Sequence, residues 1–300
     1  MSLNQESMGS DCREGISPVI RRRFSCRTYS EKGIEEEKKK LLRDYINENK
    51  EGPFGNRIFF YFVDKNKYGE PLGSVITCGV IKGARYFISG TLKKTERAEE
   101  DFGYAMEKNI LFATGLGLGT CWLGGTFSRS RFADLTGLAE GDFIPAVTPV
   151  GYPAGKRTLL DRAIAFSASS RKRKPRDKIF FFGDISRPLS ENSAGAYSGA
   201  LECVRLAPSA SNRQPWRVIK ETGAPVFHFF LRRMPLYGSL VPGVDLQRLD
   251  MGIAMCHFEL SAEESGLCGK WILDFQPPQR AGGAEYVISW TGERQEVQEL

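Results

Sequence analysis

The chain repeats part of its own sequence at a constant distance. Residues 103–123 align without gaps to residues 252–272, and Gly, Ala, Met, Leu, Ala, Gly, Leu and Trp recur at matching positions 149 residues apart. A fainter repeat relates residues 52–57 to residues 208–213, each ahead of an apolar run. Repetition of this kind indicates one structural unit that was duplicated and then diverged. The sequence therefore predicts two related units, 15–178 and a smaller 179–300, packed as one fused body.

Each copy of the long repeat has the pattern of a helix that ends at glycine. Apolar side chains recur at helical spacing and predict two buried stripes, formed by Phe102, Ala105, Met106, Ile110 and Ala113 in the first copy and by Met251, Ala254, Met255, Phe258 and Ala262 in the second. Faces built from Met and Ala usually pack against another helix, so we interpret both stripes as core.

Helices and strands alternate along the rest of the chain. We expect further helices near residues 35–47, 128–136 and 196–205, and strands near residues 58–63, 84–89, 146–151, 217–220, 226–232 and 285–290. This mixture predicts an α+β fold, in which mixed antiparallel sheets are flanked by helices and an internal pseudo-two-fold duplication relates the units.

The composition narrows the classes of function. The seven cysteines are odd in number and scattered, with no Cys-x-x-Cys pair, and only two histidines are present. Both facts argue against a disulfide framework and against a metal site. No apolar run approaches the roughly 18 to 20 residues that span a bilayer, and residues 1–14 lack the features of a signal peptide. We therefore expect a cytoplasmic protein with no membrane partner.

Positive charge gathers in two short clusters. The net charge is +6, and the excess lies at residues 21–23 and 171–176. Basic clusters neutralise phosphates, which makes nucleic acid one alternative partner. These clusters are short and lack the interleaved aromatic residues of a single-strand binder. We therefore favour a small phosphate-bearing ligand and expect no nucleic-acid partner.

The first motif, residues 21–29, reads Arg-Arg-Arg-Phe-Ser-Cys-Arg-Thr-Tyr. Arg23, Ser25 and Arg27 stand at alternate positions, so an extended or turn-like backbone would direct two guanidinium groups and a hydroxyl to one point. The planar donors of arginine match phosphate oxygens. Alone, this triplet also fits a solvated face or a helix cap.

The second motif, residues 207–216, reads Ala-Pro-Ser-Ala-Ser-Asn-Arg-Gln-Pro-Trp. Its small hydroxyl residues and prolines predict a loop whose backbone can approach a planar ligand, while the amides of Asn212 and Gln214 can bind polar edges. Ordinary turns use the same residue types, but the complete ten-residue string is unusual for a generic turn.

Two further segments complete the pattern. Residues 115–125 read Gly-Leu-Gly-Leu-Gly-Thr-Cys-Trp-Leu-Gly-Gly, and they close a helix instead of opening one, so we reject a Rossmann site. Gly124 and Gly125 would let backbone amides reach a ligand ring, with a plain turn as the alternative. Residues 149–153 and the basic run 171–175 follow.

These four segments, in this order, resemble the signature stretches of the nitroreductase family of FMN-dependent oxidoreductases. The resemblance implies an FMN cofactor and hydride chemistry on the flavin, without a catalytic side chain or a metal. The FMN-binding positions that it implies are Arg22, Arg23, Ser25, Arg27, Leu123, Gly124, Gly125, Arg171, Arg173, Pro208, Ser209, Ala210, Ser211, Asn212 and Gln214.

The resemblance also implies an activity. NADH or NADPH would reduce the flavin, and a small electron-poor acceptor of the nitroaromatic or quinone class would then replace the donor in a ping-pong cycle. The alternatives are a flavin-binding protein without turnover, serving storage, sensing or assembly, and a different flavin reaction on the same fold.

The resemblance bears on the number of sites as well. Family members build each flavin site from two subunits. In this chain the Arg-x-Ser-x-Arg motif occurs only in the first copy and the Pro-Ser-Ala-Ser-Asn motif only in the second. We therefore expect one complete site per chain, in a monomer that acts as a pseudo-dimer.

Overall fold

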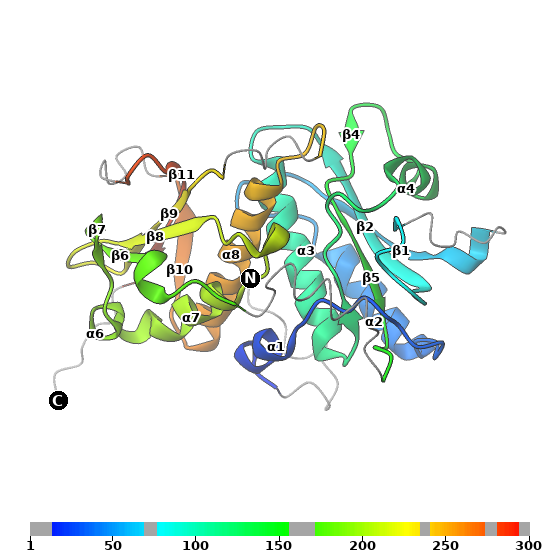
Figure 1. Ribbon diagram of the computed structural model, residues 1–300, viewed down its shortest axis with the longest axis horizontal. Helices are drawn as coiled ribbons and strands as arrows, with labels where there is room; N and C mark the ends of the chain where they lie inside the picture. The colour runs from blue at the N-terminus through cyan, green and yellow to red at the C-terminus, as the bar shows by residue number, and fades with distance from the viewer. Residues whose placement is uncertain (1–13, 69–76, 156–171, 235–240, 274–280, 294–300) are drawn as a thin grey trace.

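The computed structural model describes residues 14–68, 77–155, 172–234, 241–273 and 281–293. Two long helices, α3 (Ala98–Gly115) and α8 (Leu246–Glu264), cross at the centre of the molecule. One sheet lies on each side of this helix pair, formed by the earlier strands on one side and the later strands on the other (Figure 1). The arrangement confirms the α+β fold expected from the sequence.

The first sheet has the order β1-β2-β5-β3, and β4 pairs with β2. All of its strand pairs are antiparallel. Its strands are β1 (Phe59–Asp64), β2 (Tyr86–Lys93), β3 (Gly119–Thr120), β4 (Asp142–Phe143) and β5 (Val147–Gly151). The helices of this half besides α3 are α2 (Glu36–Glu48), the 3-10 helix η1 (Lys65–Tyr68) and α4 (Arg129–Thr136).

The second sheet has the order β10-β11-β9-β8-β6-β7. The β6–β8 pair is parallel and its other pairs are antiparallel. Its strands are β6 (Phe180–Phe182), β7 (Asp184–Pro188), β8 (Trp216–Lys220), β9 (Val226–Leu231), β10 (Gly269–Ile272) and β11 (Glu285–Gly292). The helical segments of this half besides α8 are η2 (Arg176–Lys178), α6 (Glu191–Ala194), η3 (Gly195–Tyr197), α7 (Ser198–Leu206) and η4 (Ala210–Asn212).

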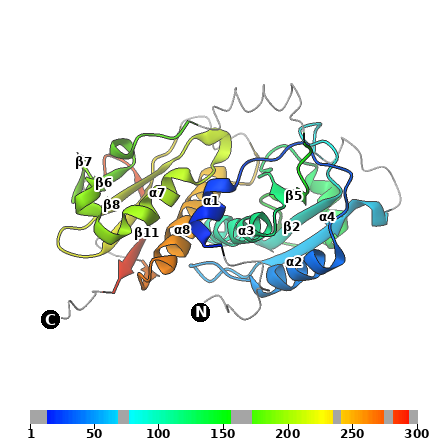
Figure 2. The same cartoon turned by 90° about the horizontal axis from the view of Figure 1, so that it is seen from below.

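A short first helix joins the halves. Helix α1 (Ile16–Arg22) lies against α3, α7 and α8, beside the crossing of the two long helices (Figure 2). Its buried Val19 and Ile20 belong to the same apolar cluster as the second sheet. The beginning of the chain therefore packs onto the half formed by its later residues.

The crossing of α3 and α8 has the symmetry of the sequence repeat. A Cβ on Gly103 would collide with the backbone of Leu249, and a Cβ on Gly252 would collide with the backbone of Glu100. Gly252 follows Gly103 by 149 positions, and Leu249 follows Glu100 by the same 149. Each copy therefore makes the other's contact in reverse, as in a two-fold interface between identical subunits.

Both long helices also end in the same way. Gly117 and Gly266, again 149 positions apart, have φ values of 77° and 71°, which favour glycine. The following amides of Leu118 and Leu267 donate back to the carbonyls of Ala113 and Ala262 at 3.0 and 2.9 Å. The repeat thus preserves its helix terminus although most side chains have changed.

The sequence locates the long elements well and misses the short ones. The expected helices and strands all occur, with ends shifted by a few residues. It does not predict α1, β3, β4, β6, β7 or β10, because two to seven residues show too little periodicity.

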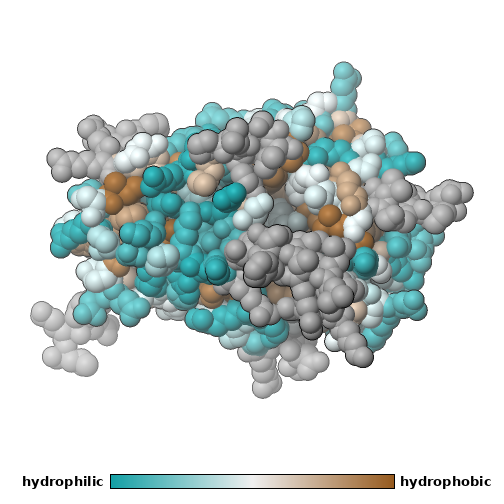
Figure 3. All heavy atoms as spheres, viewed as in Figure 1, coloured by the Kyte–Doolittle hydropathy of each residue, from teal (hydrophilic) through white to brown (hydrophobic). Residues whose placement is uncertain are grey.

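None of the helices in the described ranges is long and apolar enough to cross a membrane. The face in Figure 3 is mainly hydrophilic, with separate smaller hydrophobic areas.

Candidate functional site

One cavity of about 750 Å³ collects most of the residues that the motifs single out. Its walls come from the segment after α1, the residues after β3, the loop after α7 and the first turns of α8. The expected residues that line it are Arg23, Ser25, Arg27, Leu123, Gly124, Arg173, Pro208, Ser209, Ala210, Ser211 and Asn212. Segments up to 230 residues apart therefore meet in one place.

The segment after α1 runs extended along the first sheet. The amide of Cys26 donates to the carbonyl oxygen of Thr120 at 2.8 Å, and the amide of Lys82 donates to that of Arg27 at 2.8 Å. Alternate residues of an extended chain face the same side. That backbone explains why Arg23, Ser25 and Arg27 all reach the cavity.

Two of the arginines that line the cavity have buried donor atoms. The Nε atoms of Arg23 and Arg27 are buried and have no hydrogen-bond partner within the described residues. Oε1 of Glu107 lies 3.9 Å from Nε of Arg23, too far for a hydrogen bond. Buried guanidinium donors of this kind normally find an acceptor, so the cavity suits an anionic ligand.

Arg173 brings a third guanidinium group to the cavity and holds the second motif in place. It donates to Oδ1 of Asn212 at 2.8 Å and to the carbonyl oxygen of Leu206 at 2.9 Å. Burial, followed by the nearby charges of Arg23 and Arg205, lowers the pKa of Arg173 to about 10. Like charges gathered in a partly dry site favour the binding of an anion.

The loop after α7 has a strained backbone. Ser211, Asn212 and Gln214 have φ values of 44°, 56° and 49°, in the left-handed region that non-glycine residues rarely adopt. Left-handed geometry costs each such residue about 1 to 2 kcal/mol. Strain of this kind gathers at ligand-binding segments when the surrounding structure enforces it.

The side chain of Gln214 stabilises this loop internally. It is 2% exposed, accepts the amide N–H of Lys174 at 2.8 Å and donates to the carbonyl oxygen of Asn212 at 3.1 Å. The amide of Gln214 in turn donates to the hydroxyl of Ser209 at 2.8 Å. The sequence suggested that Gln214 binds a ligand edge, but in the structure its amide group is occupied by protein partners and does not line the cavity.

The glycine pair lies where α8 begins. A Cβ on Gly124 would lie 2.6 Å from Cδ2 of Leu246, and a Cβ on Gly125 would lie 2.9 Å from Cγ2 of Val241. Glycine at these positions therefore also allows the close approach of neighbouring side chains. Of the two, only Gly124 lines the cavity.

Helix α8 forms a wall that the sequence did not reveal. Leu246, Leu249, Asp250 and Ile253 line the cavity, and their spacing of three, four and seven residues places them on one face of the helix. The sequence pattern predicts only the adjacent stripe, which contains Met251 and Ala254. Trp122, Arg213 and Val80 also line the cavity without having been predicted as binding residues.

Two other expected positions lie elsewhere. Arg22 bonds to Glu14 and donates to the carbonyl oxygen of Thr114 at 3.3 Å, and it does not line the cavity. In a run of three arginines, only the one in register with Ser25 and Arg27 faces the site. Arg171 lies outside the described residues.

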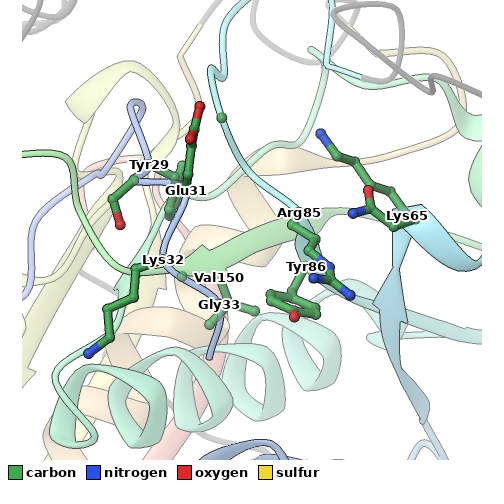
Figure 4. A pocket seen from close by; sticks show the side chains of 12 residues that line it. Tyr29, Glu31, Lys32, Gly33, Lys65, Arg85, Tyr86 and Val150 are labelled. Atoms are coloured by element: carbon green, nitrogen blue, oxygen red, sulfur yellow. The ribbon is translucent and has the colours of Figure 1, made fainter. Parts of the chain in front are cut away.

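A second, smaller cavity of about 260 Å³ lies in the first half. Figure 4 shows Glu31 and Lys32 on one side of it and Arg85 and Tyr86 on the other. Arg85 is already paired with Asp64, with Nη2 and Oδ2 2.7 Å apart. None of the expected binding residues lines this cavity, so the larger one is the candidate functional site.

Comparison with known proteins identifies the family of the chain. A family model described as "Putative TM nitroreductase" matches residues 15–262, which is most of the chain. The chain belongs to the nitroreductase family. No curated protein matches its sequence.

A solved structure has the same fold over nearly the whole chain. It is a putative nitroreductase from Thermotoga maritima, with 19% identity and a TM-score of 0.58, and the match covers 93% of this chain and 94% of that one. A putative NADH dehydrogenase/NAD(P)H nitroreductase from Bacteroides thetaiotaomicron is 26% identical, with a TM-score of 0.39, over 48% of this chain and 89% of its own. An FMN-dependent nitroreductase from Clostridium difficile matches at 19% identity and a TM-score of 0.37, over 47% of this chain and 88% of its own.

Proposed function

We propose that this nitroreductase-family oxidoreductase binds FMN in the larger cavity and transfers electrons from NADH or NADPH to a small electron-poor acceptor. The observation that carries this proposal is the convergence of Arg23, Arg27 and Arg173 and the strained loop on one cavity. Its volume of about 750 Å³ lies within the usual range of small-molecule sites, roughly 300 to 1,000 Å³.

The lining of the cavity fits the two parts of FMN. Arg23, Arg27 and Arg173 provide guanidinium donors for a phosphate, and two of them have buried Nε atoms without a described partner. Leu246, Leu249, Ile253 and Trp122 provide apolar surface for a planar ring. A ligand with an anionic end and a flat heterocycle satisfies both sets.

Bound FMN supplies the hydride chemistry of this class of enzyme. The residues of the chain bind and orient, and none of them needs to act as nucleophile or base. Ser25, Ser209 and Ser211 would offer hydroxyl groups to the cofactor, and Leu123 and Gly124 would offer backbone groups. A donor and an acceptor would bind in turn over the same exposed ring face.

We also propose one flavin site per chain, formed between units 15–178 and 179–300. Tight contacts of the repeat-related loop in the first half support this proposal. A Cβ on Gly52 would lie 2.6 Å from Cα of Asp101, the guanidinium of Arg97 lies 4.9 Å from the ring centre of Phe54, and Arg97 donates to the carbonyl oxygen of Val287 at 2.7 Å. A monomer would thus act as a pseudo-dimer with a single active site.

The absorption spectrum of the purified chain tests this proposal. We expect a flavin spectrum, or its appearance after FMN is added, with one FMN released per chain by heat. Loss of the colour on addition of NADH or NADPH, and its return with a quinone or nitroaromatic compound, would establish turnover. Stoichiometric FMN that neither nucleotide reduces would support a flavin-binding protein without turnover. A protein that rejects FMN altogether would overturn the proposal.

A further inference from the structure

Asp250 is a buried acidic residue in the wall of the larger cavity, and no motif singles it out. It lies in the first turns of α8 and is 3% exposed. Its Oδ1 accepts the amide N–H of Ala210, in the strained loop, at 2.9 Å. Its Oδ2 is buried and has no hydrogen-bond partner within the described residues. A buried carboxyl oxygen without a partner is costly, so this atom calls for an explanation.

The sequence repeat provides an internal comparison. Asp101 on α3 is the counterpart of Asp250, 149 positions earlier, and each accepts from the repeat-related loop. Oδ1 of Asp101 accepts the amide of Phe54 at 2.8 Å, and its Oδ2 accepts the amide and the side-chain nitrogen of Asn56 at 2.8 and 2.9 Å. The first copy therefore satisfies both oxygens with its own loop.

The second copy uses only half of the same arrangement. Its loop leaves Oδ2 of Asp250 without a donor, and it does so in the copy whose aspartate lines the cavity. Both copies therefore anchor their loop through the aspartate. Only Asp250, which lines the cavity, keeps one carboxyl oxygen that the loop does not bind. The difference between the copies points to a ligand contact.

We propose that Asp250 binds the flavin as a neutral carboxyl group that donates a hydrogen bond from Oδ2 to an acceptor atom of the ring system. This inference rests on the proposed function, because it assigns a contact to the same cofactor. Asp250 would then have two roles at once, as anchor of the loop through Oδ1 and as ring-binding residue through Oδ2.

The neutral form suits the surroundings of Asp250. Burial raises its pKa well above the ordinary value, the amide of Ala210 lowers it in part, and the charge of Asp245 raises it again. A protonated carboxyl group has one O–H donor, which an ionised one lacks. Ring oxygens and unprotonated ring nitrogens of a flavin are acceptors, so the donor and its target match.

FMN titration of three variants tests this role, with binding followed through quenching of flavin fluorescence. The variants are Asp250→Asn, Asp250→Ala and the control Asp101→Asn. Asp250→Asn keeps an acceptor for Ala210 and places an N–H donor where the carboxyl group had its O–H, so we expect affinity within about twofold of the unsubstituted chain. Asp250→Ala removes the donor, and we expect about tenfold weaker binding, which corresponds to about 1.4 kcal/mol. In Asp101→Asn the new side-chain NH₂ group would face N–H donors of the loop. This variant should lower the free energy of unfolding without changing FMN affinity.

An infrared difference spectrum separates ring binding from a purely structural role. The carbonyl stretch of a protonated carboxyl group should shift when FMN binds to the unsubstituted chain, and this band should be absent in Asp250→Asn. The measurement does not depend on whether Asp250→Ala folds. If Asp250 only anchored the loop through Oδ1, its carbonyl stretch would stay the same when FMN binds. A shift of the band therefore reports a new hydrogen bond from Oδ2 to the flavin.

The outcomes distinguish the two proposals. An unsubstituted chain that rejects FMN overturns the proposed function and this inference together. FMN binding with no shift of the carboxyl band, or with Asp250→Ala as tight as the unsubstituted chain, overturns only the role of Asp250. Equal weakening by Asn and Ala would mean that the site needs a charged acceptor, which also contradicts a neutral donor.

Discussion

His257 on α8 and Glu107 on α3 form a fully buried contact between the two halves of the chain. Nε2 of His257 lies 2.9 Å from Oε1 of Glu107, and Nδ1 lies 3.0 Å from the carbonyl oxygen of Cys203. Both side chains are 0% exposed. Trp122, in the cavity wall, donates its indole N–H to Oε2 of Glu107 at 2.6 Å. The contact of Trp122 with Glu107 links this buried pair to the larger cavity.

Removing one member of this pair should destabilise the protein strongly. His257→Leu leaves the carboxylate of Glu107 buried with one partner fewer, and loss of one partner of a buried pair costs about 3 to 5 kcal/mol. The double variant His257→Leu/Glu107→Leu removes the buried carboxyl group as well and should recover part of that loss. Urea unfolding of the three proteins measures both effects.

A surface pair provides the control for this experiment. Lys40 and Asp44 on α2 lie 2.8 Å apart, with side chains 77% and 53% exposed. Asp44→Asn should change the free energy of unfolding by less than about 0.5 kcal/mol. If His257→Leu were as mild as Asp44→Asn, the buried contact would not stabilise the packing of the two halves.

Gly103→Ala should destabilise the helix crossing although alanine favours helices. The added Cβ would meet the backbone of Leu249, which cannot rotate away. Overpacking of this kind costs about 1 to 3 kcal/mol or more, which exceeds the gain of about 1 kcal/mol in helix propensity. Gly199→Ala in α7, where no atom lies within 4 Å of the new Cβ, should be neutral or stabilising. Thermal unfolding should show a lower Tm for Gly103→Ala and an unchanged or higher Tm for Gly199→Ala. Equal shifts of Tm in the two variants would contradict the tight crossing of α3 and α8.

The fold and many of the residues that line the cavity could be predicted, because the repeat and the motifs are patterns within short stretches of sequence. Arg23, Ser25 and Arg27 follow the alternation of an extended chain, which sequence spacing alone reveals. Asp250 escaped prediction because its place depends on how α8 is rotated over the cavity, and the apolar stripe marks only the adjacent face of the helix. Gln214 bonds to Lys174 and Asn212 within the protein, and its left-handed backbone is a feature that no side-chain pattern records.

Arg27→Gln should weaken FMN binding much more than Arg22→Gln. A charge-assisted hydrogen bond contributes about 1.5 to 3 kcal/mol, so we expect a loss of roughly 10- to 100-fold for Arg27. Arg22 is an internal control, since it belongs to the same motif but bonds to Glu14 outside the cavity. Riboflavin, which lacks the phosphate, should bind to both variants as it binds to the unsubstituted chain. Equal effects of the two substitutions on FMN affinity would argue against a hydrogen bond from Arg27 to the FMN phosphate.

Asp250 should also give the apo-protein a pH-dependent stability of known sign. Its folded-state pKa is raised, chiefly by burial, so the folded form holds its proton after the unfolded chain has released it near pH 4. The contribution is therefore fully present below about pH 4 and declines as pH rises toward the folded-state pKa, by about 1.4 kcal/mol per pH unit. Asp250→Asn cannot ionise, so its stability relative to the unsubstituted chain should increase with pH over this window. Urea unfolding of both proteins at a series of pH values measures the difference, and a difference that is flat from pH 4 upward would mean that Asp250 is ionised in the folded state and cannot donate a hydrogen bond to a flavin.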